Sequence, residues 1–208
     1  MMPNNDIFLF MDTKITFIIP SIGRPTLNKT IDSLLAQNKS NWKAIIVFDG
    51  VDPINVNDPR IQCYQISKTG IANHAGRVRN FAIDKVDTEW MAFVDDDDTL
   101  SANYLNYFEE EISSDKDADC VIFRMLDKGF VFPEDKTKKF VINHVGISFA
   151  VRKNLNIKFE PSCTEDFYYL NTIREMKKKI ILSSHLTYFV RTDPKREFDY
   201  IKFNREIF

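Results

Sequence analysis

The sequence predicts an α/β fold: a mostly parallel central sheet flanked by helices, followed by a less regular C-terminal half. Over the first 125 residues, short apolar runs alternate with segments of helical periodicity, which is typical of a parallel sheet with crossover helices. The apolar runs lack polar alternation, as expected of strands that are buried on both faces. With 208 residues, 44% of them hydrophobic, the chain is long enough for one domain with a substantial core.

The elements of the first half follow one another at short intervals. Apolar runs rich in β-branched residues predict strands at residues 15–19, 44–48, 61–66, 90–94 and 120–123. Apolar side chains at helical spacing predict helices that begin near Pro25, Gly76 and Ala102. Pro25 suits the first turn of its helix, because the N–H that proline lacks would have no partner there.

The second half has a weaker pattern. Residues 127–142 mix Gly, Pro and Lys with few apolar residues, which predicts a hairpin or a flexible loop. The stretch Ser162–Glu165 fits a capping box that opens a helix. Apolar residues then mark the inner face of that helix: Phe167, Leu170 and Ile173. Two short strands are predicted at 180–182 and 186–190.

The net charge, the cysteines and the apolar runs limit the binding partners and the cellular location that we expect. A net charge of −2 gives no reason to expect nucleic acid as a partner. The three cysteines are odd in number and far apart, so we expect reduced thiols and a cytoplasmic location. The apolar run at 7–11 is too short to span a membrane and predicts a loosely packed extension. Peripheral membrane contact is the alternative there, and also for the basic and aromatic tail at 193–208.

Carboxylates follow two of the predicted strands directly. Asp49 comes after the strand at 44–48, and Asp95–Asp98 come after the strand at 90–94. Ligands of open α/β sheets bind outside the carboxyl ends of the strands, so both sets are expected at one site. Four adjacent carboxylates repel one another unless a cation approaches, and Mg²⁺ and Mn²⁺ prefer such oxygen ligands. The alternative is a solvated acidic turn; a calcium-binding EF-hand loop is excluded, because Leu100 stands where it requires Gly.

Four stretches of the chain, taken in order, resemble glycosyltransferase family 2, whose nucleotide-sugar-binding fold is called GT-A. The stretches are ITFIIPSIGRPTLNKTIDSLLAQ, AIIVFDG, GRVRNFAIDKVDTEWMAFVDDDDTL and CTEDFYYL. The first stretch resembles the family's opening strand and first helix, and the second resembles its second strand with a nucleoside-contacting aspartate. The third resembles its Arg-Asn helix followed by the Asp-x-Asp strand, and the fourth resembles its Glu-Asp segment. A departure is Ser101-Ala102, which stand where the family has a small residue and proline.

The resemblance implies a set of ligand-binding residues. Asp97 would hold Mn²⁺ or Mg²⁺ together with Asp95, while Asp98 would stand behind them. Asp95 or Asp96 would also lie near the ribose or a metal-bound water. The remaining substrate-binding residues would be Pro20, Ser21, Arg24, Asp49, Arg79, Asn80 and His144, with Asp49 accepting from the base of the nucleotide. From the residues alone, Arg79 could equally belong to the solvated face of its helix, and Asn80 could simply hydrogen-bond a neighbouring loop.

The resemblance also implies the catalytic residues. Asp166 would be the general base, with Glu165 beside it. At the start of a helix, Asp166 is expected to have a pKa lowered by the helix dipole, which would keep it ionised. For Glu165, a purely structural role in the capping box is the alternative.

The implied activity is metal-dependent, inverting transfer of a sugar from a nucleoside-diphosphate sugar, with UDP as the preferred carrier, to a hydroxyl of a glycan or other acceptor. The domain would comprise an N-terminal extension at 1–13, a nucleotide-sugar-binding half at 14–125, an acceptor half at 126–192 and a tail at 193–208. One rival is a sugar-phosphate nucleotidyltransferase, which would need a loop rich in Gly, Arg and Lys after the first strand; PSIGRPT has one Gly and one Arg. The other rival is a non-catalytic module that binds nucleotide sugars.

Overall fold

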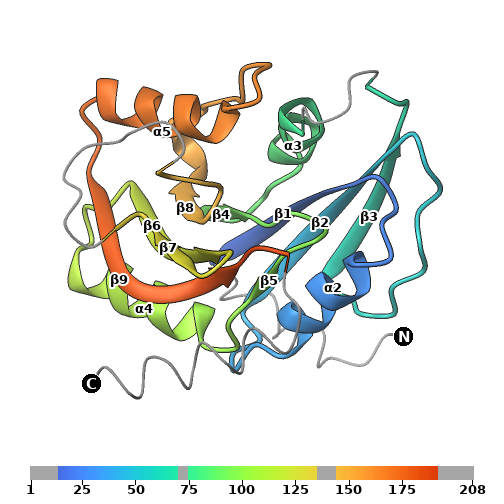
Figure 1. Cartoon of the computed structure of the whole chain (residues 1–208), viewed down its shortest axis with the longest axis horizontal. Coiled ribbons are helices and arrows are strands. Elements are labelled where there is room, and N and C mark those ends of the chain that lie inside the picture. The colour runs from blue at the N-terminus through green and yellow to red at the C-terminus, as the bar shows by residue number, and fades with distance from the viewer. Residues whose placement is uncertain (1–13, 70–74, 135–143, 192–208) are drawn as a thin grey trace.

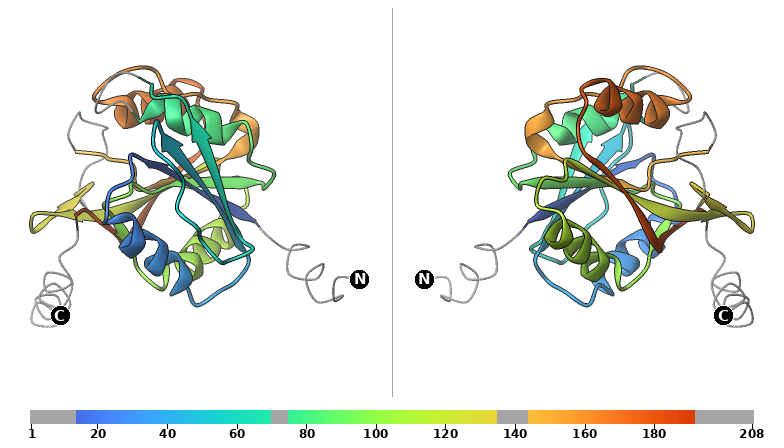
Figure 2. Two further views of the ribbon diagram at one scale, coloured as in Figure 1. Left: turned by 90° about the vertical axis from the view of Figure 1, so that its right-hand side faces the viewer. Right: turned by 90° about the vertical axis from the view of Figure 1, so that its left-hand side faces the viewer.

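The computed structural model describes residues 14–69, 75–134 and 144–191. Within these ranges, a central nine-stranded sheet runs in the order β3-β2-β1-β4-β8-β6-β9-β5, with β7 paired to β6. Helices α3 and α5 cover one face of the sheet, and α2 and α4 cover the other (Figures 1 and 2). The N-terminal extension and the C-terminal tail of the sequence prediction lie outside the described residues.

The first half forms the predicted parallel layer. Its elements in chain order are β1 (Ile15–Ser21), α2 (Leu27–Leu35), β2 (Trp42–Asp49), β3 (Ile61–Ile66), α3 (Gly76–Ile83) and β4 (Trp90–Phe93). Strand β1 pairs in parallel with both β2 and β4, and β2 pairs in parallel with β3. The side chains of β1 are buried along its whole length, which explains its unbroken apolar run.

The second half turns the sheet into a mixed one. Its elements are β5 (Thr99–Leu100), α4 (Tyr104–Ser114), β6 (Cys120–Asp127), β7 (Phe130–Phe132), β8 (Phe149–Arg152), a 3₁₀ turn (Lys153–Leu155), α5 (Glu165–Glu175) and β9 (Ile180–Phe189). Strand β8 lies antiparallel between β4 and β6, and β9 pairs in parallel with β6 and antiparallel with β5. The α/β fold of the sequence prediction is confirmed, and every antiparallel pairing involves at least one strand of this half.

Two details of the second half differ from the prediction. Strands β5 and β8 were not predicted, and β9 is one continuous strand instead of two short ones. The polar residues Ser183, Ser184 and His185 interrupt the apolar pattern of β9, but the strand continues through them with shifted register against β6. The hairpin of β6 and β7 confirms the predicted hairpin in the part of 127–142 that the structure describes.

An aromatic cluster supports the end of the sheet where the aspartates lie. The ring of Phe93, the last residue of β4, packs edge-on against Phe149 of β8 and Phe159, with centroids 5.2 and 5.0 Å apart. The ring centroid of Tyr169 on α5 lies 4.4 Å from that of Phe159, so α5 is packed onto the same cluster. These rings are all nearly fully buried, which fixes α5 relative to the end of β4.

Two further findings concern membrane spans and cysteines, and the apolar run at 7–11 itself lies outside the described residues. None of the helices in the described parts of the chain is long and apolar enough to cross a membrane. All three cysteines, Cys63, Cys120 and Cys163, are free thiols.

Candidate active site

The loop that follows β4 carries the four aspartates, and local hydrogen bonds fix its shape. The backbone N–H of Val94 still donates to Ile18 of β1 at 3.0 Å, so the loop begins at the end of the parallel sheet. A tight turn follows, in which Asp98 N–H donates to the Asp95 carbonyl at 3.1 Å. The buried hydroxyl of Thr30 on α2 donates to the Asp98 carbonyl at 2.7 Å. The loop is therefore held from both β1 and α2.

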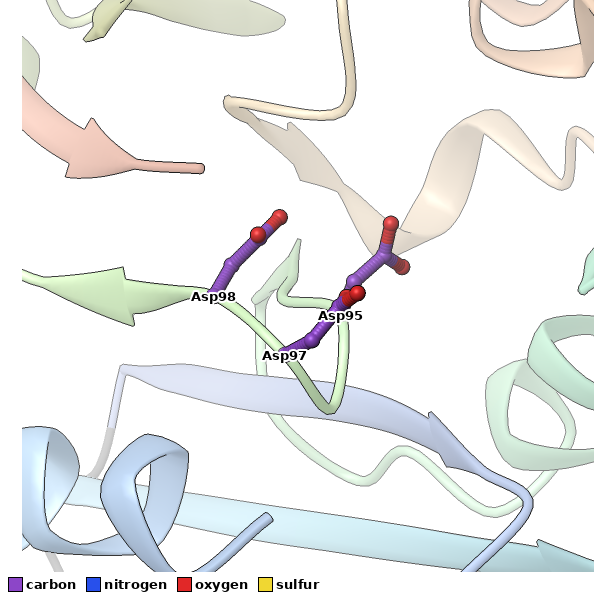
Figure 3. A group of neighbouring side chains, drawn as sticks. All are labelled: Asp95, Asp97 and Asp98. Atoms are coloured by element: carbon purple, nitrogen blue, oxygen red, sulfur yellow. The ribbon is translucent and has the colours of Figure 1, made fainter. Parts of the chain in front are cut away.

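Three of the aspartates gather their carboxylates. Asp95, Asp97 and Asp98 each offer an oxygen, and these oxygens all lie within 4.8 Å of one another. Figure 3 shows the three side chains rising from one loop toward the same side of it. Carboxylate oxygens at this spacing suit a hard divalent cation such as Mg²⁺ or Mn²⁺. The sequence prediction of a metal on Asp97 and Asp95 therefore fits the donor set, to which Asp98 adds a third oxygen.

The carboxylate of Asp96 binds the loop between β1 and α2 and does not belong to the cluster of Asp95, Asp97 and Asp98. The Asp96 side chain is 4% exposed and accepts from the Ser21 hydroxyl at 2.8 Å and from the backbone N–H of Ile22 at 3.2 Å. Its other oxygen accepts from Arg24 at 2.9 Å. Asp96 thus fastens the loop between β1 and α2 to the aspartate loop, which brings the predicted residues Ser21, Arg24 and Asp96 together.

Asp98 is bound by the end of β9. Its carboxylate accepts from the Tyr188 hydroxyl at 2.7 Å and from the backbone N–H of Arg191 at 2.7 Å. The same hydroxyl accepts from the backbone N–H of Asp95 at 3.1 Å. Burial, followed by repulsion from Asp95, raises the pKa of Asp98 to about 8 against the effect of these hydrogen bonds. A cation between the carboxylates would favour the ionised form.

Asp97 is flanked by two arginines. Its Oδ2 lies 3.2 Å from Arg24 Nη1 and 3.6 Å from Arg191 Nε. The Asp97 side chain is 21% exposed, so its carboxylate remains accessible to a ligand. Sequence reasoning included Arg24 but missed Arg191 and Tyr188, because single residues near the end of a strand carry no recognisable motif.

Arg79 connects the aspartate loop to α5. Its guanidinium donates to both Asp95 and Glu165, and its side chain is 5% exposed. Burial by itself would lower the pKa of Arg79, but the carboxylates of Asp95 and Glu165 outweigh it and raise the pKa. The alternative that Arg79 belongs to the solvated face of α3 is wrong; its neighbour Arg77 lies on that face.

Glu165 is not part of a capping box. Thr164 stands at the N-cap of α5 without a side-chain cap hydrogen bond. The Glu165 carboxylate turns to α3, where it accepts from the backbone N–H of Gly76 at 2.9 Å and from Arg79. A Cβ on Gly76 would lie 2.8 Å from Phe159 Cβ and closer still to Glu165 Oε2, so the approach of the two helices requires glycine.

Asp166 follows in the first turn of α5. Burial raises the pKa of Asp166, against the hydrogen bond from Phe167 N–H and the nearby charge of Arg79. The expectation that the helix dipole lowers this pKa was therefore wrong, because desolvation of the carboxylate is the larger effect. A Cβ on Gly146 would lie 3.8 Å from Asp166 Oδ2, which places the segment around Gly146 next to this carboxylate.

The other predicted site residues lie around this centre. Asp49, at the end of β2, accepts from the backbone N–H of Thr69 at 2.7 Å and from its hydroxyl at 2.8 Å. Pro20 lies in β1 beside β2. The side chain of Asn80 is paired with the backbone of Phe159 in both directions, at 2.9 and 2.8 Å. The ring of His144 packs edge-on against Phe132, with centroids 6.1 Å apart.

The following solved structures have a similar fold, and all are structures of glycosyltransferases. S. aureus TarS, residues 1–349, superposes with a TM-score of 0.66 at 17% sequence identity, over 85% of this chain and 60% of that one. The same protein in complex with UDP-GlcNAc gives a TM-score of 0.64 at 16% identity, over 86% and 59%. The mannosyltransferase PcManGT from Pyrobaculum calidifontis, in complex with GDP-Man and Mn²⁺, gives 0.61 at 13% identity, over 87% and 57%. At such identities the likeness establishes the fold, which is GT-A.

Of the two sequence comparisons, one identifies a family. The comparison with curated proteins found no match. The chain spans about 60% of the length of the TarS chain to which it is similar. A sequence profile described as "Glycosyl transferase family 2" matches residues 16–169, a range that begins in β1 and contains the aspartate loop and the first turn of α5. The chain belongs to glycosyl transferase family 2.

Proposed function

We propose that the protein is a metal-dependent, inverting glycosyltransferase that moves a sugar from a nucleoside-diphosphate sugar, with UDP as the preferred carrier, to a hydroxyl of its acceptor. One observation carries the proposal. On a family 2 fold, the carboxylates of Asp95, Asp97 and Asp98 converge within 4.8 Å at the carboxyl end of β4. That edge is where open α/β sheets bind ligands.

The spacing of the strands supports an extended donor along this edge. Strand β1 lies between β2 and β4, so the ends of β2 and β4 are about 10 Å apart. The nucleoside would lie near Asp49 and Pro20 at the β2 side, and the diphosphate would lie at Asp97. Solved neighbours in complex with UDP, UDP-GlcNAc and GDP-Man support this class of donor.

The aspartate loop would hold Mn²⁺ or Mg²⁺ through Asp97 and Asp95, with Asp98 next to them. The bound cation would supply Lewis-acid neutralisation of the charge that develops on the leaving diphosphate. The loop itself is preorganised for this task, because Asp96, Thr30 and Tyr188 hold its backbone and its carboxylates in place before any ligand arrives.

Asp166 would act as the general base. It is in the first turn of α5, which Arg79 and Glu165 tie to the aspartate loop. Burial raises the pKa of Asp166, which makes its ionised carboxylate a stronger base toward the proton of a hydroxyl acceptor. Single displacement by the acceptor oxygen, with its proton passing to Asp166, inverts the anomeric centre. Glu165 serves to orient this helix, since Gly76 and Arg79 occupy its oxygens.

The acceptor would approach from the side of α5 and Gly146, where Asp166 lies. His144 is two residues from Gly146 and would shape this acceptor side. The three free thiols support a cytoplasmic location, where they would stay reduced.

The experiment that tests the proposal is a calorimetric titration of UDP, GDP and their sugars, with Mn²⁺ and then with EDTA. We expect metal-dependent binding of one nucleotide class, lost in Asp97→Ala. Asp87→Ala is the matched control, because Asp87 is exposed and pairs only with Lys43 among the contacts described. A folded protein that binds none of these nucleotides would contradict the proposal, and the aspartate loop would then be an acidic turn.

A further inference from the structure

Two arginines from distant parts of the chain meet at a single oxygen atom. Arg24 comes from the loop between β1 and α2, and Arg191 follows the end of β9. Arg24 Nη1 lies 3.2 Å and Arg191 Nε lies 3.6 Å from Oδ2 of Asp97. In this structure, the guanidiniums of Arg24 and Arg191 therefore supply the positive charge beside Asp97.

These two arginines differ from Arg79 in their freedom to move. The side chains of Arg24 and Arg191 are 42% and 72% exposed, whereas that of Arg79 is 5% exposed between two carboxylates. An exposed ion pair is weak and exchanges readily with water or another ion. A buried pair cannot open without leaving an unpaired charge in the interior. Arg191 can leave Asp97, and Arg24 can leave it while its Nη1 still donates to Asp96 Oδ1 at 2.9 Å, whereas Arg79 stays in place.

The backbone of Arg191 is nevertheless fixed at the aspartate loop. Its N–H donates to Asp98 Oδ1 at 2.7 Å, and the preceding N–H of Val190 donates to the Leu126 carbonyl at 2.9 Å. The Tyr188 hydroxyl holds the same stretch to Asp98. A guanidinium that leaves Asp97 therefore remains tethered beside whatever binds there.

A divalent cation and the two guanidiniums compete for Asp97. A cation bound to this carboxylate at the usual 2.0–2.6 Å brings two positive charges against the guanidiniums and repels them. The displaced guanidiniums carry several N–H donors in a planar fork, a geometry that matches phosphate oxygens. We propose that Arg24 and Arg191 form an exchangeable diphosphate clamp, which covers Asp97 in the metal-free protein and turns to the donor's diphosphate once the metal is bound. This inference rests on the proposed function and adds Arg191 to the donor site.

The test uses Arg191→Gln in the full chain and measures two affinities by calorimetry. Without its competing charge, Asp97 should bind Mn²⁺ alone about two- to fivefold more tightly, as an exposed ion pair implies. With Mn²⁺ saturating, UDP or GDP should bind about tenfold more weakly, because one charge-assisted contact to the diphosphate is lost. UMP or GMP should change by less than about twofold, since the clamp would act mainly on the terminal phosphate. A merely structural role for Arg191 would weaken both metal and nucleotide binding.

Arg174→Gln is the matched control, because it makes the same substitution at an exposed arginine in the last turn of α5. It should leave both affinities unchanged, and Arg191→Lys should retain part of the diphosphate affinity. The inference is overturned if the wild-type chain binds the diphosphate with Mn²⁺ and Arg191→Gln binds metal and diphosphate as the wild type does; the proposed function would then stand. A wild-type chain that binds Mn²⁺ but no nucleotide would overturn both.

Discussion

The guanidinium of Arg79 donates to the carboxylate of Glu165 across 86 positions of the chain, and this buried ion pair ties α3 to the first turn of α5. The same guanidinium also donates to Asp95, so one side chain joins the proposed metal site to the helix of the proposed base. Its Nε has no hydrogen-bond partner among the described residues. The position of Asp166 relative to the aspartate loop therefore depends on Arg79.

Replacing Arg79 by methionine should destabilise the fold strongly. The substitution leaves the carboxylate of Glu165 buried without its ion partner, and such losses cost about 3–5 kcal/mol. Urea unfolding measures the change in the free energy of unfolding. Arg77→Met, two residues away on the exposed face of α3, is the control and should stay within about 0.5 kcal/mol of wild type. Equal effects of the two substitutions would show that the buried pair has no special role.

Gly76→Ala should disturb the contact between α3 and α5. The added methyl group would lie 2.8 Å from Phe159 Cβ and would also collide with the Glu165 carboxylate that Gly76 binds. Overpacking of this kind costs about 1–3 kcal/mol, which exceeds the gain of up to about 1 kcal/mol that alanine brings in a helix. Thermal unfolding measures the result, with Arg77→Ala as the control on the same helix. An alanine variant as stable as wild type would mean that the two helices can separate freely.

Asp166→Asn tests the proposed base. The amide keeps the shape of the side chain but accepts no proton, so kcat should fall by about 10²–10⁴. Nucleotide affinity should be unchanged, because the donor would bind at the aspartate loop. Steady-state kinetics and calorimetry on the same sample separate the two effects. Retention of full transfer activity would remove Asp166 from the mechanism.

The pH profile of kcat/KM should reflect the burial of Asp166. Because burial raises the pKa of its carboxyl group, Asp166 becomes protonated at a higher pH than an ordinary aspartate, whose pKa is about 4. Activity that needs the ionised form is therefore present above the raised pKa of Asp166 and is lost as the pH falls through it. The acid limb should accordingly lie above about pH 4. An acid limb at or below that value would contradict this assignment.

Tyr188→Phe should loosen the aspartate loop without altering a carboxylate. The variant removes the hydroxyl that donates to Asp98 and accepts from the backbone of Asp95. Partners that orient metal ligands typically affect metal affinity by 10–100-fold, so we expect Mn²⁺ to bind about tenfold more weakly. Calorimetry measures this affinity, and Tyr168→Phe on the exposed side of α5 is the control. Unchanged metal affinity would mean that the loop keeps its shape without Tyr188.

The parallel half of the fold was predictable because its strands are buried on both faces. Runs such as the one in β1 admit few other interpretations, and all four aspartates follow such a run. Strand β8 escaped prediction because it has only four residues and pairs antiparallel between strands far away in the sequence. The sequence predicted the two halves of β9 as separate strands. It did not predict that they are continuous, because pairing with β6 overrides the polar residues in the middle of β9.

The site was predictable only where residues form a motif. The aspartates and the Glu-Asp pair stand in recognisable stretches, whereas Tyr188 and Arg191 act through single tertiary contacts with the loop. The partners of Glu165 were equally hidden: a capping box satisfies the sequence pattern, but the approach of Gly76 in space decides where the carboxylate points. The pKa of Asp166 depends on how deeply its helix packs, which local sequence does not encode.

The end of β9 has a consequence for the order in which the protein takes shape. Tyr188 reaches an aspartate that precedes it by 90 positions. At translation rates of about 5–20 residues per second, the acidic loop emerges on the order of 5–20 s before its hydroxyl partner. During that interval, a nascent chain carries the carboxylates without their contacts to Tyr188 and Arg191. Binding of the proposed donor would therefore require a chain that has been synthesised at least as far as Tyr188.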